Sequence, residues 1–413
     1  MTYRHPHWVT GLILAVCSAQ LHAATLAEAI AGGTVQLNSR LRYENAQQDH
    51  LAREANALTL RTRLAYTTAA WSGFDAQLEF EGTSVLGDDD YNSGDNGRTQ
   101  FPVIADPKGS EFNQAWIRYT GLPQTTLRLG RQRLILDNAR FIGNVGWRQN
   151  EQTFDALWLG TRAIPGLYLQ YAYLDNVNMF RSFPINGAND NDLAIGAHLL
   201  NGAVQVVERA LHVSTYAYLL DFDAIPAPAL ARQDTRTLGL RATGAQTLRG
   251  LQLDYALEYA DQRAYQDAPD DVHASYQLAE LALGGGGVKG TLGYERLSGD
   301  GGYSFQTPLA TLHAFQGWAD IFLVTPAAGI RDRYLSLGAR LGRLSLLAAH
   351  HDYRADAGDA DYGTELNLQA THPLARRLNG GIKYAHYRAD SFPVSGGETF
   401  DTRRLWVWAE YAF

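Results

Sequence analysis

The sequence predicts an all-β fold, a transmembrane up-and-down antiparallel β-barrel with long extracellular loops and short periplasmic turns. Three observations predict it. Apolar and polar residues alternate in segments of about nine to eleven residues, the length that a tilted strand needs to cross a bilayer. Long and short connections alternate along the chain, and the last segment ends on the aromatic residue Phe413.

The alternation gives each segment one apolar and one polar face. In TVQLNSRLRYE (34–44), the apolar residues Val35, Leu37, Leu41 and Tyr43 share a face, and polar residues occupy the other. LQLDYALEY (251–259) repeats the pattern. One face would meet lipid and the other the lumen.

Such segments predict about eighteen strands, an even number typical of outer-membrane barrels. They lie near residues 34–44, 57–67, 74–82, 113–120, 125–134, 153–162, 167–175, 192–200, 210–220, 234–243, 250–260, 273–283, 287–296, 333–341, 344–353, 362–371, 378–388 and 402–413. Sixteen strands is the alternative, because the segments 153–162, 192–200 and 273–283 have ambiguous faces.

The connections between these segments alternate in length. Every odd-numbered connection is longer than both its neighbours, and the longest are 83–112 and 297–332. Extracellular loops opposite short periplasmic turns have this arrangement. A soluble sandwich, β-helix or propeller is the alternative, but the chain has no repeat of fixed period.

Residues 1–23 are predicted to be a secretory signal, followed by one barrel domain over 24–413. Arg4 precedes a short apolar run from Val9 to Cys17, and small residues follow near Ala23. The run is too short to span a bilayer. Cys17 is the only cysteine, so the mature chain is expected to have no disulfide. The net charge is −8, which argues against a nucleic-acid partner.

Strand parity assigns a row of basic side chains to the lumen. Their number is nearly matched by acidic side chains with the same parity, so two interpretations stay open: an anion-attracting pore lining, or ion-pair ladders that hold the wall together. The basic candidates for the pore lining on this parity are Arg40, Arg42, Arg61, Arg63, Arg118, Arg128, Arg340 and Arg404.

The stretch LRLGRQRLILDNARFIGNVGWRQNEQTFDAL (127–157) departs from regular alternation. Arg131 and Arg133 share the parity of Leu127 and Leu129, which would direct them toward lipid. Either they lie beyond the membrane, or Gly130 marks a bulge that redirects them. The loop that follows is a candidate for folding inward and narrowing the pore.

This stretch, together with YERLSGDGGYSFQTPLATLHAFQGWAD (294–320), resembles the alginate export family of outer-membrane proteins. The resemblance covers nearly the whole mature chain. It implies an eighteen-stranded monomeric barrel whose Arg-lined, electropositive pore passes an anionic polysaccharide. It also implies pore roles for Arg131 and Arg133 in the GRQR segment, for the basic Arg148 and for the acidic Asp155.

Two connections suggest further features. Thr307 and Pro308 are typical of a helix start, so the connection 297–332 is predicted to hold a short helix that orders the loop or gates the mouth. LGDDDYNSGDNGR (86–98) resembles a calcium loop, but Ser93 stands where an EF-hand needs Gly, which favours a solvated loop. No cofactor or metal is expected.

The last segment, RRLWVWAEYAF, directs Arg404, Trp406, Trp408 and Glu410 inward, and its two tryptophans would suit sugar stacking. Its aromatic end resembles the signal read by barrel-assembly machinery. We expect a monomer in the bacterial outer membrane, in contact with lipid, that passively passes anionic saccharide or other anionic solutes. A porin for small solutes unrelated to exopolysaccharide is the alternative, and no persuasive catalytic set indicates a barrel enzyme.

Overall fold

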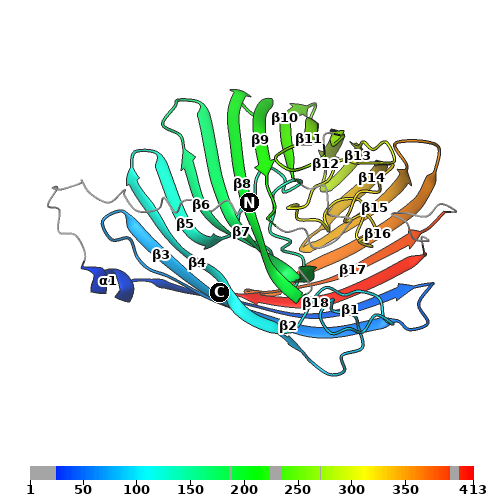
Figure 1. The fold of residues 1–413 in the computed structure, drawn as a ribbon, viewed down its shortest axis with the longest axis horizontal. Helices are drawn as coiled ribbons and strands as arrows, with labels where there is room; N and C mark the ends of the chain where they lie inside the picture. Colours follow the sequence, from blue (N-terminus) through cyan, green and yellow to red (C-terminus); the bar gives the residue numbers. More distant parts are fainter. Residues whose placement is uncertain (1–24, 186–187, 224–233, 270, 391–399) are drawn as a thin grey trace, which may run out of the picture.

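In the computed structural model the chain forms a closed antiparallel barrel of 18 strands. The structure describes residues 25–185, 188–223, 234–269, 271–390 and 400–413 (Figure 1). Each strand pairs with the next along the chain, and the first pairs with the last. The predicted fold is therefore confirmed, and the count is eighteen rather than sixteen.

The strands are close to their predicted positions. Their bounds are β1 (Thr34–Gln48), β2 (Ala55–Thr67), β3 (Phe74–Val85), β4 (Gly109–Leu122), β5 (Thr125–Gln132), β6 (Thr153–Thr161), β7 (Leu167–Ile185), β8 (Ala188–Val207), β9 (Leu211–Leu220), β10 (Thr235–Leu248), β11 (Leu251–Ala264), β12 (His273–Gly285), β13 (Val288–Leu297), β14 (Ile330–Leu341), β15 (Leu344–Arg354), β16 (Asp361–Ala375), β17 (Leu378–Arg388) and β18 (Thr402–Ala412). Most differences are extensions of a few residues at the end that carries the long loops.

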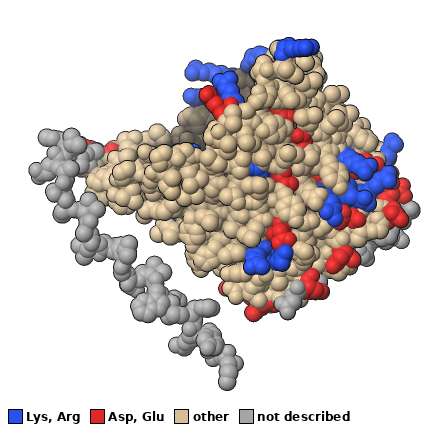
Figure 2. Space-filling model, turned by 90° about the horizontal axis from the view of Figure 1, so that it is seen from above, with Lys and Arg blue, Asp and Glu red and all other residues tan. Residues whose placement is uncertain are grey.

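The two faces of the wall differ as the alternation predicts. On β2 the side chains of Leu58 and Leu64 are exposed on the outside, whereas Thr59 and Arg61 are buried on the inside. Figure 2 shows most of one outer face free of charge, with charged side chains gathered toward its margins. No helix in the described part of the chain is long and apolar enough to cross a membrane.

One expectation about the connections is wrong. A long loop was predicted between 175 and 192, but β7 and β8 have 19 and 20 residues and form an extended hairpin there. The ladder continues with bulges beyond the length that crosses a bilayer. Residues that were predicted to be a loop therefore form strands, because pairing between β7 and β8 satisfies their backbone N–H and C=O groups.

A short helix, α1 (Leu26–Ala31), precedes the barrel and was not predicted. Thr25 and Glu28 form a capping box at its start. The Tyr66 hydroxyl donates to the Ile30 carbonyl, which fixes the helix beside the short-turn end of β2. The predicted signal, residues 1–23, lies outside the described residues.

The prediction of a helix in the connection between β13 and β14 is wrong. The described residues 298–329 contain turns and bends but no helix. Leu312, Gln316 and Asp320 have positive φ angles, which a right-handed helix does not allow. The apolar residues pack sideways onto the barrel wall instead, with Phe322 against the ring of Tyr353.

The barrel closes through β1 and β18. Their pairing extends from Gln48 opposite Thr402 to Asn38 opposite Ala412. Beyond it, the backbone N–H groups of Leu37 and Phe413 each donate to the other residue's carbonyl, at 3.0 and 2.9 Å. The closed ladder removes the open sheet edge, which hydrocarbon does not tolerate.

Candidate permeation pathway

Three loops fold into the barrel and fill its middle: residues 86–108, 133–152 and 298–329 (Figure 1). The last two bond to each other directly. The Gly143 N–H donates to the Leu309 carbonyl at 2.8 Å, and the Thr311 N–H donates to the Ala139 carbonyl at 3.0 Å. An inward fold of the loop after β5 was anticipated from the sequence, and the other two loops join it.

Arg140 fastens the 133–152 loop to both the wall and the 298–329 loop. Its Nε donates to Glu295 on β13 at 2.6 Å, and its other nitrogens donate to Thr307 and Gln316 at 3.0 Å. The guanidinium is almost fully buried, and so is its carboxylate partner. Charge-assisted hydrogen bonds of this kind fix the relative position of the two loops.

A second charge network lies between the inward loops and the strands β1 and β18. Arg148 from the 133–152 loop binds Glu44 of β1 at 3.1 Å and Asp320 of the 298–329 loop at 2.6 Å. Arg404 of β18 binds the other oxygen of Glu44 at 3.1 Å, and Arg42 of β1 is paired with Asp106 of the 86–108 loop. Two of the inward loops are thus paired with β1, the third is paired with Arg148, and Arg404 ties β18 to Glu44 of β1. We call these buried ion pairs the constriction network.

His313 extends this network to β17. Its Nδ1 lies 2.8 Å from Asp320, and its Nε2 lies 2.8 Å from Lys383 Nζ. An ammonium can only donate, so Nε2 accepts and Nδ1 carries the proton donated to Asp320. Burial, followed by the charge of Lys383, lowers the pKa of His313 to about 3. Burial opposes ionisation of Asp320, but His313 and Arg148 together lower its pKa.

Tryptophans surround the Lys383 ammonium. Its Nζ lies 4.1 Å from the ring centre of Trp147 and 3.8 Å from that of Trp318. The rings of Trp147 and His313 are parallel, with centres 4.9 Å apart. Aromatic faces attract a cation, so loop and wall are joined here by ring contacts as well as by charges.

Arg40 differs from the other constriction arginines because its partners carry no charge. It donates to the carbonyls of Trp147 and Arg148 at 2.9 and 2.6 Å, and to the Gln149 side chain at 2.9 Å. Arg40, on β1, lies directly opposite Arg61 of β2, and like charges in directly opposite positions destabilise a sheet. Glu410 on β18, which pairs with Arg61 at 3.0 Å, offsets part of this repulsion.

A cavity of about 680 Å³ lies on the short-turn side of this region. Glu151 is buried at its wall, contacts Arg63 at 3.5 Å and is bonded to Arg133. Burial opposes ionisation of Glu151, but these two arginines lower its pKa. The cavity is lined by Gln36, Leu37, Asn38, Arg40, Arg61, Arg63, Ala65, Glu79, Arg133, Asn144, Gly146, Glu151, Glu410, Ala412 and Phe413.

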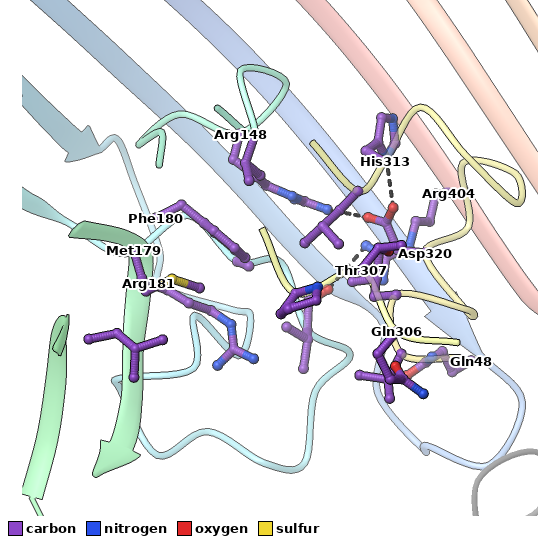
Figure 3. Close-up of a pocket in the computed structure, with 18 residues that line it drawn as sticks. Gln48, Arg148, Met179, Phe180, Arg181, Gln306, Thr307, His313, Asp320 and Arg404 are labelled. Atoms are coloured by element: carbon purple, nitrogen blue, oxygen red, sulfur yellow. Dashed lines mark hydrogen bonds and ion pairs between the residues drawn. The ribbon is translucent and has the colours of Figure 1, made fainter. Parts of the chain in front are cut away.

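A second cavity of about 380 Å³ lies on the long-loop side (Figure 3). Apolar side chains such as Met179 and Phe180 form much of its lining, and Arg148, Arg404 and Asp320 form its charged side. Val145 and Arg148 line this cavity, whereas Asn144 and Gly146 line the other. The segment 144–148 therefore separates an upper from a lower chamber.

Most predicted pore residues have inward side chains, but their partners differ. Arg118 is paired with Asp75 at 2.7 Å, and Arg128 lies over the rings of Trp116 and Trp158. The inward positions on the strands are Arg40, Arg42, Arg61, Arg63, Arg118, Arg128, Arg340 and Arg404. Arg340 is exposed at the end of β14, beside a short turn, and away from the others.

The GRQR segment separates the two arginines that the resemblance grouped. Gly130 is not a bulge, because β5 keeps its register through it with both neighbours. Arg131 lies opposite Asp155 on the same outer face as Leu129, and the two form a bidentate pair at 2.8 Å. Arg133 follows the end of β5 and turns inward to Glu79 and Glu151. Arg131 and Asp155 therefore do not line either chamber.

The two tryptophans of β18 also differ from each other. Trp406 is completely buried against Trp147 and His313, so it offers no free face for a sugar in this arrangement. Trp408 is partly buried and covers Gly381 of β17, where a Cβ would lie 2.3 Å from its ring. Packing against the inward loops thus explains the position of Trp406, and packing against the wall explains that of Trp408.

Several residues of the constriction were not singled out from the sequence. Asp106, Trp147, His313 and Asp320 lie on loops, where alternation says nothing about direction. For Trp147, His313 and Asp320 the usable signal was their position within the two stretches that carry the family resemblance, whereas Asp106 lies outside both stretches. Strand parity cannot find groups of this kind, because their position depends on how each loop folds.

A sequence model of the family described as "Alginate export" matches residues 33–309, which is more than half of the chain. The chain belongs to the alginate export family. A comparison of the sequence with curated proteins finds no match. The resemblance found in the sequence is therefore confirmed by a match that spans most of the barrel.

Solved structures similar to this alginate export family member are outer-membrane channels. OccAB2 of Acinetobacter baumannii is 18% identical, with a TM-score of 0.72, over 94% of this chain and 99% of that one. OpdO of Pseudomonas aeruginosa is 17% identical, with a TM-score of 0.67, over 94% and 98%. OpdK of Pseudomonas aeruginosa, solved with vanillate, is 15% identical, with a TM-score of 0.68, over 93% and 99%. Fold and family together identify an outer-membrane channel of the porin type.

Proposed function

We propose that this outer-membrane channel passively passes anionic solutes, with anionic saccharides as the first class to test. The observation that carries the proposal is Arg40. Its guanidinium lies at the lower chamber, next to Arg61, and is bonded to neutral acceptors only. Glu410 lies opposite Arg40 on β18, but no ion pair of Arg40 is found among the described residues. Positive charge that is not held in an ion pair attracts anions and repels cations.

The strands on either side of Arg40 support this assignment. Lys383, Arg404, Arg42, Arg61 and Arg63 face inward on the four adjacent strands β17, β18, β1 and β2. These cations make the potential along this part of the wall more positive. The guanidinium forks also suit carboxylates, which they can bind through two hydrogen bonds.

Most of the other arginines are structural: their ion pairs hold the loops and the wall together, and we call them struts. Arg42, Arg63, Arg133, Arg148 and Arg404 are each paired with a buried carboxylate. The two interpretations that strand parity left open therefore apply to different residues. Selectivity is expected to depend on Arg40 and Arg61, and the shape of the constriction on the paired arginines.

The family favours an anionic polysaccharide, and the vanillate in the OpdK structure is a small anion. The inward loops narrow the lumen between the chambers, so passage of a polymer requires the 298–329 loop to move aside. Small anions need a smaller displacement. Liposome swelling with glucuronate, its oligomers and neutral glucose separates these cases, and faster entry of glucose than of both anions would contradict the proposal.

Reversal potential in planar bilayers tests the charge mechanism directly. In a KCl gradient we expect chloride selectivity for the wild-type channel and a several-fold lower chloride-to-potassium permeability ratio for Arg40→Gln. Arg249→Gln, at the exposed turn between β10 and β11, is the matched control and should behave as wild type. A cation-selective wild-type channel, or an unchanged ratio in Arg40→Gln, would overturn the assignment.

We further infer that one chain forms a complete channel, because the β1–β18 pairing leaves no strand edge open. Lipid contacts the apolar outer face, and the barrel-assembly machinery is the expected partner of the last strand. The fold and the family are those of channels rather than of enzymes.

A further inference from the structure

The barrel wall has a gap at its long-loop end, between β4 and β7. The strands between them are short there: β5 ends at Gln132, and β6 begins at Thr153. The part of β4 from Gly109 to Gln114 pairs with β3 but not with β5. Only side chains bridge the gap, such as Asn178, which donates to Glu111 Oε2 at 3.2 Å.

A polar cavity of about 320 Å³ occupies this gap. It shares only Arg181 with the long-loop chamber and no residue with the other chamber. Acidic, amide and hydroxyl groups form most of its lining, together with the basic residues Lys108, Arg131 and Arg181. The lining residues on which the argument depends are Glu81 and Thr83 of β3, Glu111 of β4, Asp95 of the 86–108 loop and Asp192 of β8.

Three oxygen atoms that line this cavity have no hydrogen-bond donor among the residues that the structure describes. They are Glu81 Oε1, Thr83 Oγ1 and Glu111 Oε1, and all three are buried. The residues Glu81 and Thr83 are only 2% and 6% exposed. A buried acceptor without a partner is unfavourable, so three of them in one cavity indicate a bound group that donates or carries positive charge.

The register adds a charge argument. Glu81 lies directly opposite Glu111, and Thr83 lies opposite Gly109, so the three oxygens come from neighbouring positions on one face. Carboxylates directly opposite repel each other. Arg63 binds the other oxygen of Glu81, and no ion pair of Glu111 is found within the described ranges.

We propose that Glu81, Thr83 and Glu111 hold a hydrated divalent cation, Ca²⁺ or Mg²⁺, in this gap. Carboxylate, hydroxyl and amide oxygens with water are the ligands that these hard cations prefer. An anion fits less well, because the unsatisfied atoms are acceptors. Of the three basic residues that line the cavity, Arg131 is bound to Asp155 through two nitrogens, Arg181 interacts with the charge of Asp95, and Lys108 is exposed. The proposal does not depend on which solute the channel passes.

The acidic segment 86–98 contributes in a different way from a calcium loop. Asp89 and Asp90 pair with Arg98 of the same segment, whereas Asp95 lines the cavity. Within the described residues no group of three or more acidic, His or Cys side chains converges closely enough to hold a metal alone. Water and neutral oxygens therefore complete the shell, and the site is of the weak kind found in extracellular proteins.

The cation would be held by β3 and β4, which already pair with each other, and its water shell would extend the contact across the gap toward Asn178 of β7. At this point no ladder hydrogen bonds connect β4 to the next strand of the wall. A divalent ion that binds only the folded barrel raises its stability by mass action. Removal of the ion should loosen the long-loop end and leave the β1–β18 side unchanged.

Calorimetric titration of the EDTA-stripped full chain in detergent tests the proposal with CaCl₂ and with MgCl₂ as probes. We expect one site per chain with a Kd of about 10⁻⁴–10⁻³ M, and at least tenfold weaker binding by Glu111→Gln. Glu208→Gln, at the exposed turn between β8 and β9, is the control and should bind as wild type. CaCl₂ should also raise the Tm of the wild-type barrel above that in KCl of equal ionic strength.

A wild-type chain without saturable heat for either ion, or a Glu111→Gln chain that binds as wild type, would overturn the proposal and leave only water in the gap. Thr83→Val is the second variant, and it decides the matter if Glu111→Gln does not fold. Arg40→Gln should keep its ion binding, so a failure of the anion-channel proposal and a failure of the cation site give different results.

Discussion

At the scale of single residues, buried charges with several partners set the shape of the constriction. Glu151 is completely buried, and it accepts hydrogen bonds from Asn113 and Asn144 at 2.6 Å in addition to its contacts with Arg63 and Arg133. Loss of one member of a buried network leaves the other charges without compensation. The effect of a substitution here therefore exceeds the value of any one pair.

We expect Glu151→Gln to lower the free energy of unfolding of the barrel by about 3–5 kcal/mol. Urea titration of the refolded barrel in detergent, followed by tryptophan fluorescence, measures the change. Glu54→Gln is the control. It changes an exposed carboxylate in the loop just before β2, and its free energy of unfolding should remain within about 0.5 kcal/mol of wild type. Equal stability of the two variants would show that Arg63 and Arg133 find other partners.

His313 gives the barrel a predicted sensitivity to acid. Its pKa is lowered to about 3 in the folded state, against about 6.5 when unfolded. Between these values the unfolded chain binds more protons, so stability falls as the pH drops from about 6.5 toward 3, by up to about 1.4 kcal/mol per pH unit. The lowered pKa of Asp320 acts in the same direction, but only below about 3.8.

Urea titrations at pH 7, 6, 5 and 4 measure this slope. His313→Gln removes the titrating group, keeps a polar side chain and should flatten the profile between pH 6.5 and 4. His212→Gln, on β9 and outside the constriction network, is the comparison and should keep the wild-type slope. An identical slope in the wild type and His313→Gln would mean that other groups cause the acid sensitivity.

At the scale of elements, the 298–329 loop is the longest of the three inward loops, and it can be shortened without breaking a strand. It supplies His313, Trp318 and Asp320 and is bonded to the wall mainly through side chains. An eighteen-stranded wall is wide enough to leave a water-filled lumen once nothing fills it. We therefore expect this loop to limit the current through the channel.

We expect replacement of residues 309–321 by a short Gly/Ser linker to raise the single-channel conductance several-fold, with the barrel still folded. Conductance in symmetric KCl measures the effect, and heat-modifiable gel mobility checks the fold. The same replacement of residues 266–269, in the connection between β11 and β12, should leave conductance unchanged. Unchanged conductance after removal of 309–321 would place the limiting constriction in the other two loops.

At the scale of the whole molecule, closure depends on the last strand. Phe413 exchanges two backbone hydrogen bonds with Leu37, and its ring lies 5.2 Å from the Arg377 guanidinium. A substitution of the side chain keeps the backbone bonds. It therefore separates a role in pairing from a role in recognition by the assembly machinery.

We expect Phe413→Ala to refold in detergent much as wild type does but to reach the outer membrane of cells in several-fold lower amount. The fraction of heat-modifiable barrel in purified outer membranes measures assembly. Phe74→Ala removes another exposed phenylalanine at the short-turn end, on β3, and is the control. Poor refolding of Phe413→Ala in detergent would assign the residue to closure itself.

Sequence reasoning reached most of the wall but little of the interior. Strand positions, their number and the direction of Arg40, Arg61 and Arg63 follow from alternation, because each strand must present one face to lipid. The long loop predicted before β8 was wrong, since pairing in a hairpin overrode its polar composition. The helix at Thr307 was wrong because packing onto the wall overrode a local start signal.

The sequence by itself determined a closed barrel, its long loops and the row of basic residues inside it, because each of these depends on the period of two along a strand. Only the tertiary structure decided which arginines are struts, that Arg131 faces outward, and that His313 and Asp320 meet Lys383. Those contacts join residues far apart in the chain through loops without periodicity. Their positions depend on how three loops pack against each other within one wall.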